Sequence, residues 1–292
     1  MTSAGHMGMM SRRGGQLYAQ QDKLVFWLDA RDAVVRDTNL GDKLPQEKWI
    51  VENWKERISG NWLNEGGLMT RASGMTPSWY YSYPVHPTAD GKGVEVKVVD
   101  NWGFSNDYAQ VLKGTWRTET SAALQSVHAA KIGTLEACYE IPGPTISTTS
   151  YMPNCLTFGP AARGTYAGTW YSNSKKCLKL GICGSTLTGN TGAPVISDLP
   201  MKVWGASSKP VADAGAFSTI WVNGSKDVDG VQSSNAGVVP TNNYCQLFAN
   251  SSSDSNYNIS PIIIHSVRIY SVSLTAEEIE HNRAVDLELF GV

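Results

Sequence analysis

Short apolar runs alternate with polar, turn-rich segments along the chain from residue 23 onward. The first run, 23–29, is rich in aromatic residues and ends in Asp29, which predicts a strand. Residues 93–99 alternate apolar and polar side chains with a period of two, which predicts a half-buried strand. Many short strands joined by turns predict an all-β sandwich. The other predicted strands are 134–141, 155–158, 165–171, 178–183, 201–204, 217–222, 244–249 and 262–272.

Two local motifs predict how particular strands end. Asn223-Gly224 follows the strand 217–222, and this dipeptide is a strong signal for a tight hairpin. After the last strand, Thr275 and Glu278 have the spacing of a capping box that begins a helix. The stripe of this helix that should dock on the sandwich contains Ile279, Asn282, Val285 and Asp286.

The composition is that of a folded chain with a large core. Of the 292 residues, 41% are hydrophobic and ten are tryptophan, which excludes wholesale disorder. The net charge is −2, from 24 basic and 26 acidic residues, and the absence of a basic run argues against nucleic acid as a partner. No apolar stretch approaches the roughly 18 residues of a membrane span, so no membrane partner is expected.

The five cysteines have no spacing typical of a metal site. Cys138 and Cys155 lie in apolar runs, where a buried free thiol is the ordinary state. A disulfide between Cys177 and Cys183 across a hairpin is the less favoured alternative to free thiols. The N-terminus lacks the continuous apolar stretch of a secretory signal, so we expect folding in a reducing cytoplasm.

Three segments of the sequence carry a family resemblance. The apolar strand 24–30 ends in Asp-Ala, and Trp54-Lys-Glu-Arg-Ile-Ser-Gly-Asn61 is a charged turn that begins with tryptophan. The chain closes with Ile264-His-Ser-Val-Arg-Ile-Tyr270 followed by the capped helix. Together these segments resemble the beginning and end of concanavalin A-like (laminin-G-like) jelly-roll domains, the lectin–glucanase family.

This resemblance covers most of 23–292. It implies a jelly-roll sandwich of two antiparallel sheets with one short C-terminal helix, preceded by an N-terminal arm, 1–22. The region at about 63–92 has no counterpart, and we expect an elaborated loop there. The fold hosts lectins, glycosidases, adhesion modules and viral surface proteins. The resemblance is to domains of the type found in bacteriophage structural proteins and bacterial surface proteins.

The sequence lacks the catalytic motif of the glycosidases that belong to this family. Those enzymes place Glu-x-Asp-x-x-Glu on one strand, because a retaining mechanism needs two carboxylates roughly 5–5.5 Å apart. Glu136 and Glu140 have the even spacing of a shared strand face, but we interpret them as a polar outer face with Leu135, Ala137 and Tyr139 directed inward. The sequence therefore favours a protein that is not an enzyme, with a glycoside hydrolase as the alternative.

One pair of acidic residues has part of a metal-binding pattern. Asp227-Val-Asp229-Gly230 supplies two oxygen ligands and a glycine turn, a fragment of a calcium loop. The full loop with its terminal glutamate is absent, so a plain hairpin is the favoured interpretation. We expect no cofactor, with calcium at Asp227 and Asp229 as the alternative.

Aromatic residues gather in two polar segments of the chain. Rings beside Asn and Asp often hold sugars, because sugar rings present apolar C–H faces. The same rings also anchor long loops and form subunit interfaces, which is the favoured interpretation here, with a glycan platform as the alternative. The residues are Trp79, Tyr80, Tyr81 and Tyr83 in one segment and Trp102 and Tyr108 in the other.

The sequence thus favours a structural or adhesion protein on the surface of a bacteriophage virion, associated with capsid or tail, with glycans as candidate ligands. The arm 1–22 would contact other copies of the chain or other particle proteins. The alternative is a carbohydrate-binding module of a bacterial cell surface or a secreted protein.

Overall fold

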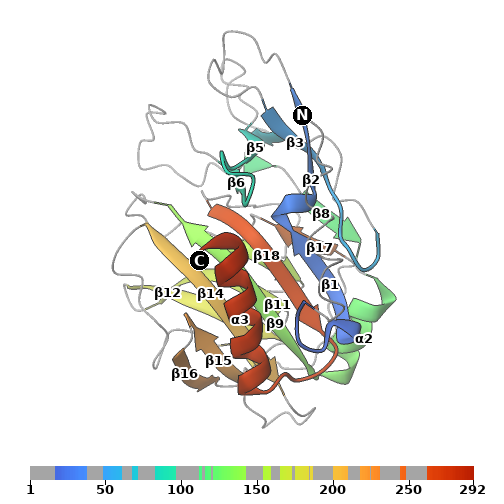
Figure 1. Cartoon of the computed structure of the whole chain (residues 1–292), viewed down its shortest axis with the longest axis vertical. Helices are drawn as coiled ribbons and strands as arrows, with labels where there is room; N and C mark the ends of the chain where they lie inside the picture. The colour runs from blue at the N-terminus through green and yellow to red at the C-terminus, as the bar shows by residue number, and fades with distance from the viewer. Residues whose placement is uncertain are drawn as a thin grey trace.

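Antiparallel strands make up most of the chain that the structure describes, and a helix closes it (Figure 1). The structure is a computed structural model. It describes residues 17–37, 49–60, 68–71, 83–96, 112–113, 116–119, 121–142, 154–158, 165–172, 175–183, 185–186, 200–209, 218–223, 225–230, 244–247 and 262–292. Two antiparallel sheets pack against each other, as the sequence predicts.

Within these residues the larger sheet has the strand order β16-β15-β14-β9-β18-β6-β5-β4-β7. On the side of β18 opposite β9, β6 pairs with Ile262–Ile264 and β1 pairs with the later part of the strand. The strands are β1 (Leu24–Asp29), β4 (Leu68–Arg71), β5 (Tyr83–Pro87), β6 (Val94–Val96), β7 (Leu112–Lys113), β9 (Gly133–Ile141), β14 (Met201–Lys209), β15 (Ser218–Val222), β16 (Ser225–Gly230) and β18 (Ile262–Tyr270).

The smaller sheet has the order β13-β12-β11-β10-β17-β8 in the described part of the chain, and β2 and β3 form a separate ribbon. Its strands are β8 (Trp116–Glu119), β10 (Asn154–Phe158), β11 (Thr165–Ser172), β12 (Lys175–Ile182), β13 (Ser185–Thr186) and β17 (Tyr244–Leu247). The remaining elements are β2 (Ala33–Asp37), β3 (Trp49–Trp54), η1 (Gln21–Lys23), η2 (Ala30–Asp32), α2 (Ala122–Ala130) and α3 (Ala276–Phe290).

The main core lies between the two sheets. In β9, Leu135, Ala137 and Tyr139 point into it, as the alternation in the sequence predicts. Phe158 and Leu180 come from the smaller sheet and are also fully buried in this core. The strands predicted from the sequence are present at these positions because their apolar faces alternate with the correct period.

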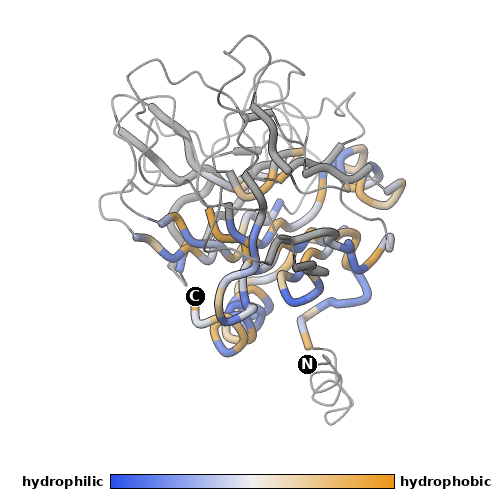
Figure 2. Tube along the Cα trace, turned by 90° about the horizontal axis from the view of Figure 1, so that it is seen from above, coloured by the Kyte–Doolittle hydropathy of each residue, from blue (hydrophilic) through white to orange (hydrophobic). Residues whose placement is uncertain are grey.

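The other face of the larger sheet is covered by α3, which crosses β9, β14 and β18 (Figure 1). Seen along its axis, α3 lies on one side of the strands and carries both hydrophobic and hydrophilic residues (Figure 2). The capping box of Thr275 and Glu278 is confirmed. The predicted docking stripe is confirmed, because Ile279, Asn282 and Asp286 are buried and the half-buried Val285 packs against the same apolar cluster. The residues of α3 that are buried are Ile279, Asn282, Asp286 and Phe290.

Local turn chemistry is confirmed at one hairpin and was missed at one helix. Asn223 adopts a left-handed backbone between β15 and β16, and its side-chain oxygen accepts a hydrogen bond from the Trp204 N–H at 2.8 Å. The helix α2 was not predicted. Its signals are Ser121, whose hydroxyl caps the Leu124 N–H, and the alanine-rich run that follows.

The cysteine interpretation holds for the three cysteines whose side chains are described. Cys138, Cys155 and Cys183 are buried free thiols. The alternative of a disulfide between Cys177 and Cys183 is wrong, because Cys177 lies within β12 and Cys183 directly follows the same strand. Six residues of extended chain span roughly 20 Å, far beyond the reach of a disulfide.

Trp27 in β1 is buried, with 5% of its surface exposed, on the face of the larger sheet that α3 covers. Its ring packs edge-on against Tyr18, and the Arg57 guanidinium lies 4.2 Å from its centre. We expect Trp27→Ala to lower the free energy of unfolding by about 3 kcal/mol, the lower end for a deleted core aromatic, because Arg57 can partly fill the space. Urea unfolding measures the change, and an unchanged midpoint would contradict the packing.

Candidate functional site

A buried charged cluster lies between α3 and the larger sheet, centred on Arg268 of β18. The guanidinium Nε donates to Glu136 Oε2 at 2.9 Å, and Nη1 donates to Asp286 Oδ1 at 2.9 Å. The cation therefore links β9 to α3. Arg268, Glu136 and Asp286 are each at most 1% exposed. An ion pair this deeply buried is stable only when hydrogen bonds satisfy the remaining polar atoms.

Neutral side chains complete the cluster. The Tyr18 hydroxyl and the Trp204 indole N–H both donate to the Asp286 carboxylate, each at 2.8 Å. The Asn282 amide donates to Glu136 at 3.0 Å and accepts from the Ala19 N–H at 2.7 Å. Residues 17–22, which the sequence assigned to the N-terminal arm, thus contact α3 through Tyr18 and Ala19.

The cluster holds two carboxylates against one guanidinium, and this affects its electrostatics. Burial raises the pKa of Glu136 above its ordinary value, while the charge of Arg268 opposes the shift. Burial also raises the pKa of Tyr18, so its hydroxyl stays protonated and donates to Asp286. The side chains are closed off from solvent. The cluster therefore fixes α3 on the sheet and offers no surface to a substrate.

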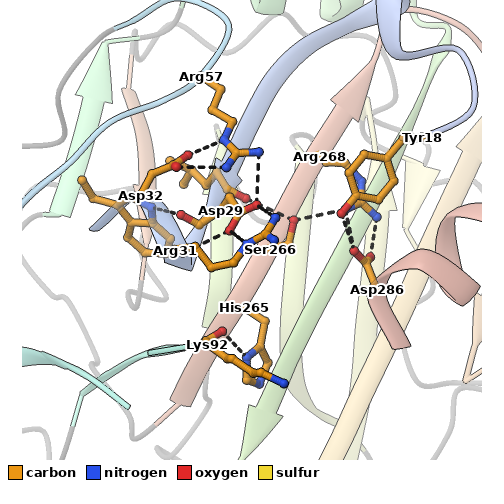
Figure 3. A network of polar contacts seen from close by, with 12 residues as sticks. Tyr18, Asp29, Arg31, Asp32, Arg57, Lys92, His265, Ser266, Arg268 and Asp286 are labelled. Carbon is orange, nitrogen blue, oxygen red and sulfur yellow. Dashed lines mark hydrogen bonds and ion pairs between the residues drawn. The ribbon is translucent and has the colours of Figure 1, made fainter. Parts of the chain in front are cut away.

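A second charged cluster lies beside it at the end of β1. Asp29 accepts hydrogen bonds from the Arg31 side chain, and Arg57 Nη1 lies 3.2 Å from Asp29 Oδ2. Arg57 also pairs with Asp32. Burial raises the pKa of Asp29, but the Arg31 hydrogen bond and the Arg57 charge outweigh it and hold the pKa below its ordinary value. Figure 3 shows both clusters, with Ser266 between them.

The charged turn is described as far as residue 60, and one carboxylate holds it on β1. Glu56 is 1% exposed, and its Oε1 accepts from the Trp27 N–H at 2.6 Å and the Ile58 N–H at 2.9 Å. The Trp54 indole N–H donates to the Asp29 carbonyl at 2.8 Å. Hydrogen bonds from this segment therefore hold β1 in place. The segment is the one that carries the family resemblance at the start of the domain.

The paired glutamates of β9 do not form an open polar face, which corrects the interpretation made from the sequence. Glu136 is directed away from the core, as alternation predicts, but α3 covers it completely. Glu140 lies at the edge of the covered face, 3.0 Å from His265 Nε2 and 3.7 Å from Lys202 Nζ. Both carboxylates are engaged with cations or amide groups of the protein.

The aromatic residues singled out in the sequence fall mostly outside the described residues. Trp79, Tyr80, Tyr81, Trp102 and Tyr108 lie there, while Tyr83 is the first residue of β5. The strands that flank these residues are described. The segment 72–82 connects β4 to β5, and the segment 97–111 connects β6 to β7.

The register shows that the strands flanking these two segments begin or end at the same end of the sheet. Met69 pairs with Tyr83, and Arg71 pairs with Leu112, so β4 ends where β5 and β7 begin. Val96 ends β6 opposite Val85, and β6 runs antiparallel to β5, so it points toward the same end. We call the end of the sheet at which β6 ends, β4 ends and β5 and β7 begin the aromatic edge. Neighbouring strands lie about 4.8 Å apart, so the edge is roughly 15 Å wide.

The calcium alternative stays a prediction. Asp227 and Asp229 lie two residues apart on β16, in the hairpin that follows Asn223. Among the described side chains, no group of three or more His, Cys, Asp or Glu residues is arranged to hold a metal ion.

Sequence reasoning missed several residues that organise the fold. His128 of α2 is 2% exposed, and its Nε2 lies 2.9 Å from the Thr165 hydroxyl of β11. Arg268 and Tyr18 were missed because an arginine in an apolar strand and a tyrosine in a polar arm carry no local signal of burial. His265 lies in β18, and His281 is exposed on α3.

The chain matches no protein-family model and no curated protein. Solved structures with a similar arrangement include the Trypanosoma rangeli sialidase in complex with sialic acid, with 14% identity and a TM-score of 0.45. The match covers 92% of this chain and 34% of the sialidase. Another is the binding domain of botulinum neurotoxin DC in complex with rat synaptotagmin II, with 8% identity and a TM-score of 0.49, covering 92% of this chain and 52% of that domain.

The same toxin binding domain has also been solved in complex with SialylT, with 8% identity, a TM-score of 0.46 and coverage of 91% and 51%. The chain spans about a third of the length of the sialidases and about half of the toxin domains. The sialidases contradict the expectation from the sequence that the protein is not an enzyme. At these TM-scores the likeness transfers no activity to this chain. No helix in the described chain is long and apolar enough to cross a membrane.

Proposed function

We propose that this chain is a carbohydrate-binding module with a concanavalin A-like jelly-roll fold, which binds glycans through the aromatic edge. The observation that supports the proposal is the strand register, which brings the strands flanking the segments 72–82 and 97–111 to the same end of the sheet. Aromatic residues that are 20 or more positions apart in sequence can therefore meet. Stacking platforms for sugar rings need such a gathering of flat apolar surfaces beside polar groups.

The sheet behind this edge suits it for binding. The central strands of the larger sheet are packed between the core and α3, and β6 joins them through its pairing with β18 and the buried Val94. A rigid scaffold lowers the ordering cost of binding, because the ligand does not have to order the strands that present the contact residues. Rings carried on connections between fixed strands can thus select one glycan arrangement.

The proposed setting is the surface of a bacteriophage virion or of a bacterial cell. The proposed partners are other copies of the chain or other particle proteins, contacted through the part of the N-terminal arm that precedes Leu17. Leu17 and Tyr18, the first residues that the structure describes, pack against α3.

The test is glycan binding by the full chain on an array that includes sialylated glycans and β-glucans. We expect Trp79→Ala to weaken binding to the best glycan at least tenfold, about 1.4 kcal/mol, with an unchanged melting temperature. Ile58→Ala is the matched control, because Ile58 is an exposed apolar residue (43% exposed) outside the aromatic edge, and it should leave binding unchanged.

Two results would contradict the proposal. The first is a wild-type chain that binds no glycan of the array at millimolar concentration. The second is a Trp79→Ala variant that keeps full affinity but melts several degrees lower or changes its oligomeric state in light scattering. That second result would assign the aromatic residues to loop packing or to a subunit interface.

A further inference from the structure

Asn223 is an exposed residue of the turn that joins β15 to β16. Val222 pairs with Ser225, so the turn consists of Asn223 and Gly224. Asn223 has a left-handed backbone with φ of 49°, which asparagine tolerates better than most residues that carry a side chain. The β15–β16 hairpin lies at the opposite side of the larger sheet from β5 and β6 (Figure 1). It is therefore separate from the aromatic edge.

The side chain of Asn223 continues the pairing of β14 with β15 beyond the last residue pair, Gly205 with Val222. The Asn223 N–H donates to the Trp204 carbonyl at 2.8 Å, and its Oδ1 accepts from the Trp204 N–H at 2.8 Å. Its Nδ2 donates to the Lys202 carbonyl at 3.2 Å. The side chain thus acts as acceptor and donor at once, which an amide can do and a carboxylate cannot.

The next residue in the sequence gives this amide an intramolecular reaction. Asn223-Gly224 is the only Asn-Gly pair of the chain. The glycine main-chain nitrogen can attack the asparagine Cγ, because glycine has no Cβ to crowd the approach. The N–Cγ bond forms, the Cγ–Nδ2 bond breaks, and Nδ2 leaves as ammonia with the proton of the attacking nitrogen. Water then opens the succinimide ring at either carbonyl, which gives aspartate or isoaspartate.

The bonds to β14 slow this reaction in the folded chain. Ring closure turns the Asn223 side chain onto the nitrogen of the following residue, so Oδ1 has to leave the Trp204 N–H and Nδ2 has to leave the Lys202 carbonyl. Each hydrogen bond lowers the population of the free side chain roughly fivefold, and two together lower it more than tenfold. Because Asn223 is exposed, water reaches the amide without opening the core.

We propose that Asn223 is a modification site of the folded chain, at which conversion to aspartate or isoaspartate loosens the β15–β16 hairpin. Aspartate has no donor for the Lys202 carbonyl, so two oxygen atoms face each other where the structure has a hydrogen bond. Isoaspartate lengthens the backbone of a turn whose length fixes the pairing of Val222 with Ser225. Either product weakens the attachment of β16 to the sheet.

The first test follows the reaction in the full wild-type chain, folded and in urea, at mildly alkaline pH. Mass spectrometry of the peptide that contains residue 223, with enzymatic methylation of isoaspartate, measures the product. We expect Asn223 to be the fastest asparagine to react in urea, and to react at least tenfold more slowly in the folded chain. Asn282 is the control asparagine, because it is buried and precedes Arg283, and it should stay unmodified in the folded chain.

Three results of this test would overturn the proposal. The first is a chain in urea that forms no isoaspartate at residue 223. The second is an equal rate in the folded and unfolded chains, which would mean that the bonds to β14 do not restrain the amide. The third is a folded chain that stays unmodified for roughly a hundred half-times of the unfolded chain, beyond the protection that two hydrogen bonds give.

Gly224→Asp tests the chemical route. A Cβ beside the attacking nitrogen crowds ring closure, so we expect the rate at Asn223 in urea to fall about tenfold. An unchanged rate would mean that the amide is hydrolysed without ring closure, and would overturn the role of the Asn-Gly pair.

Asn223→Asp measures the effect of one product in a freshly made chain. Amide hydrogen exchange at position 223, whose N–H donates to the Trp204 carbonyl, should become about fivefold faster. Asn223→Gly is the matched control, because glycine keeps the left-handed backbone and removes both side-chain bonds, and it should exchange at least as fast. Wild-type protection in Asn223→Asp would overturn the loosening of the hairpin. No glycan is present in these experiments, so their outcome does not depend on the proposed function.

Discussion

Replacing Arg268 by methionine is expected to lower the free energy of unfolding by about 3–5 kcal/mol, the usual cost of breaking a buried ion pair. The variant leaves Glu136 and Asp286 buried without their shared cation, and both are fully enclosed between β9, β18 and α3. Methionine has nearly the volume of the arginine stem, so the loss reports charge and hydrogen bonding more than a cavity.

Arg283→Met is the matched control for this prediction. Arg283 lies on the same helix and pairs with Glu280 at 2.9 Å, but this pair is partly exposed. Exposed pairs of this kind contribute at most about 1 kcal/mol. Urea unfolding of both variants measures the difference, and equal midpoints would contradict the assigned role of Arg268.

A double variant tests whether the uncompensated carboxylates cause the loss. Arg268→Met combined with Glu136→Gln removes one buried negative charge, so it should recover part of the stability lost in Arg268→Met. If the two changes simply add, the two residues are not coupled, and the cluster does not act as a unit.

The strands and the last helix could be predicted from the sequence because their signals are local. Alternation in β9 separates Leu135 and Tyr139 from Glu136, and the capping box of Thr275 begins α3 without help from tertiary contacts. The turn at Asn223 is equally local. In each case, the residues that decide the structure lie within a few positions of one another.

The covered polar face could not be predicted for the opposite reason. The strand pattern predicts that Glu136 is exposed, and the helix pattern predicts that Asn282 interrupts the apolar stripe. In the structure the Asn282 amide donates a hydrogen bond to Glu136, which lies 146 positions earlier in the sequence. Two polar stripes become one buried layer only when they are matched in space. A single sequence gives no information on which polar stripes pair in space. For the same reason, the sequence does not reveal that Tyr18 of the arm joins this buried layer.

The aromatic edge could be predicted from the sequence only in part. The aromatic residues are visible in the sequence, and the strand 93–99 was expected next to one of the segments. The arrangement of the strands that flank these segments depends on the pairing of Arg71 with Leu112, which joins β4 to β7 over a long stretch of sequence. Such non-local pairing has no local signature.

A buried histidine of α2 makes the folded chain sensitive to acid. His128 lies against the Phe158 ring and the Thr165 hydroxyl, with no carboxylate beside it among the contacts described. Its burial lowers the pKa to about 3, so it is neutral in the folded chain.

The second large effect is therefore an acid sensitivity caused by His128. In the unfolded chain the imidazole titrates near its ordinary pKa of about 6.5, so below this pH the unfolded state binds a proton that the folded state does not. Stability should fall as the pH decreases from about 6.5 to about 3, by up to 1.4 kcal/mol per pH unit and about 5 kcal/mol in total.

Urea unfolding at pH 7, 5.5 and 4.5 measures the slope. His128→Gln should be less stable at pH 7 but should lose less stability on acidification, whereas His281→Gln should keep the wild-type slope. A slope in His128→Gln as steep as that of the wild type would show that other groups cause the acid sensitivity.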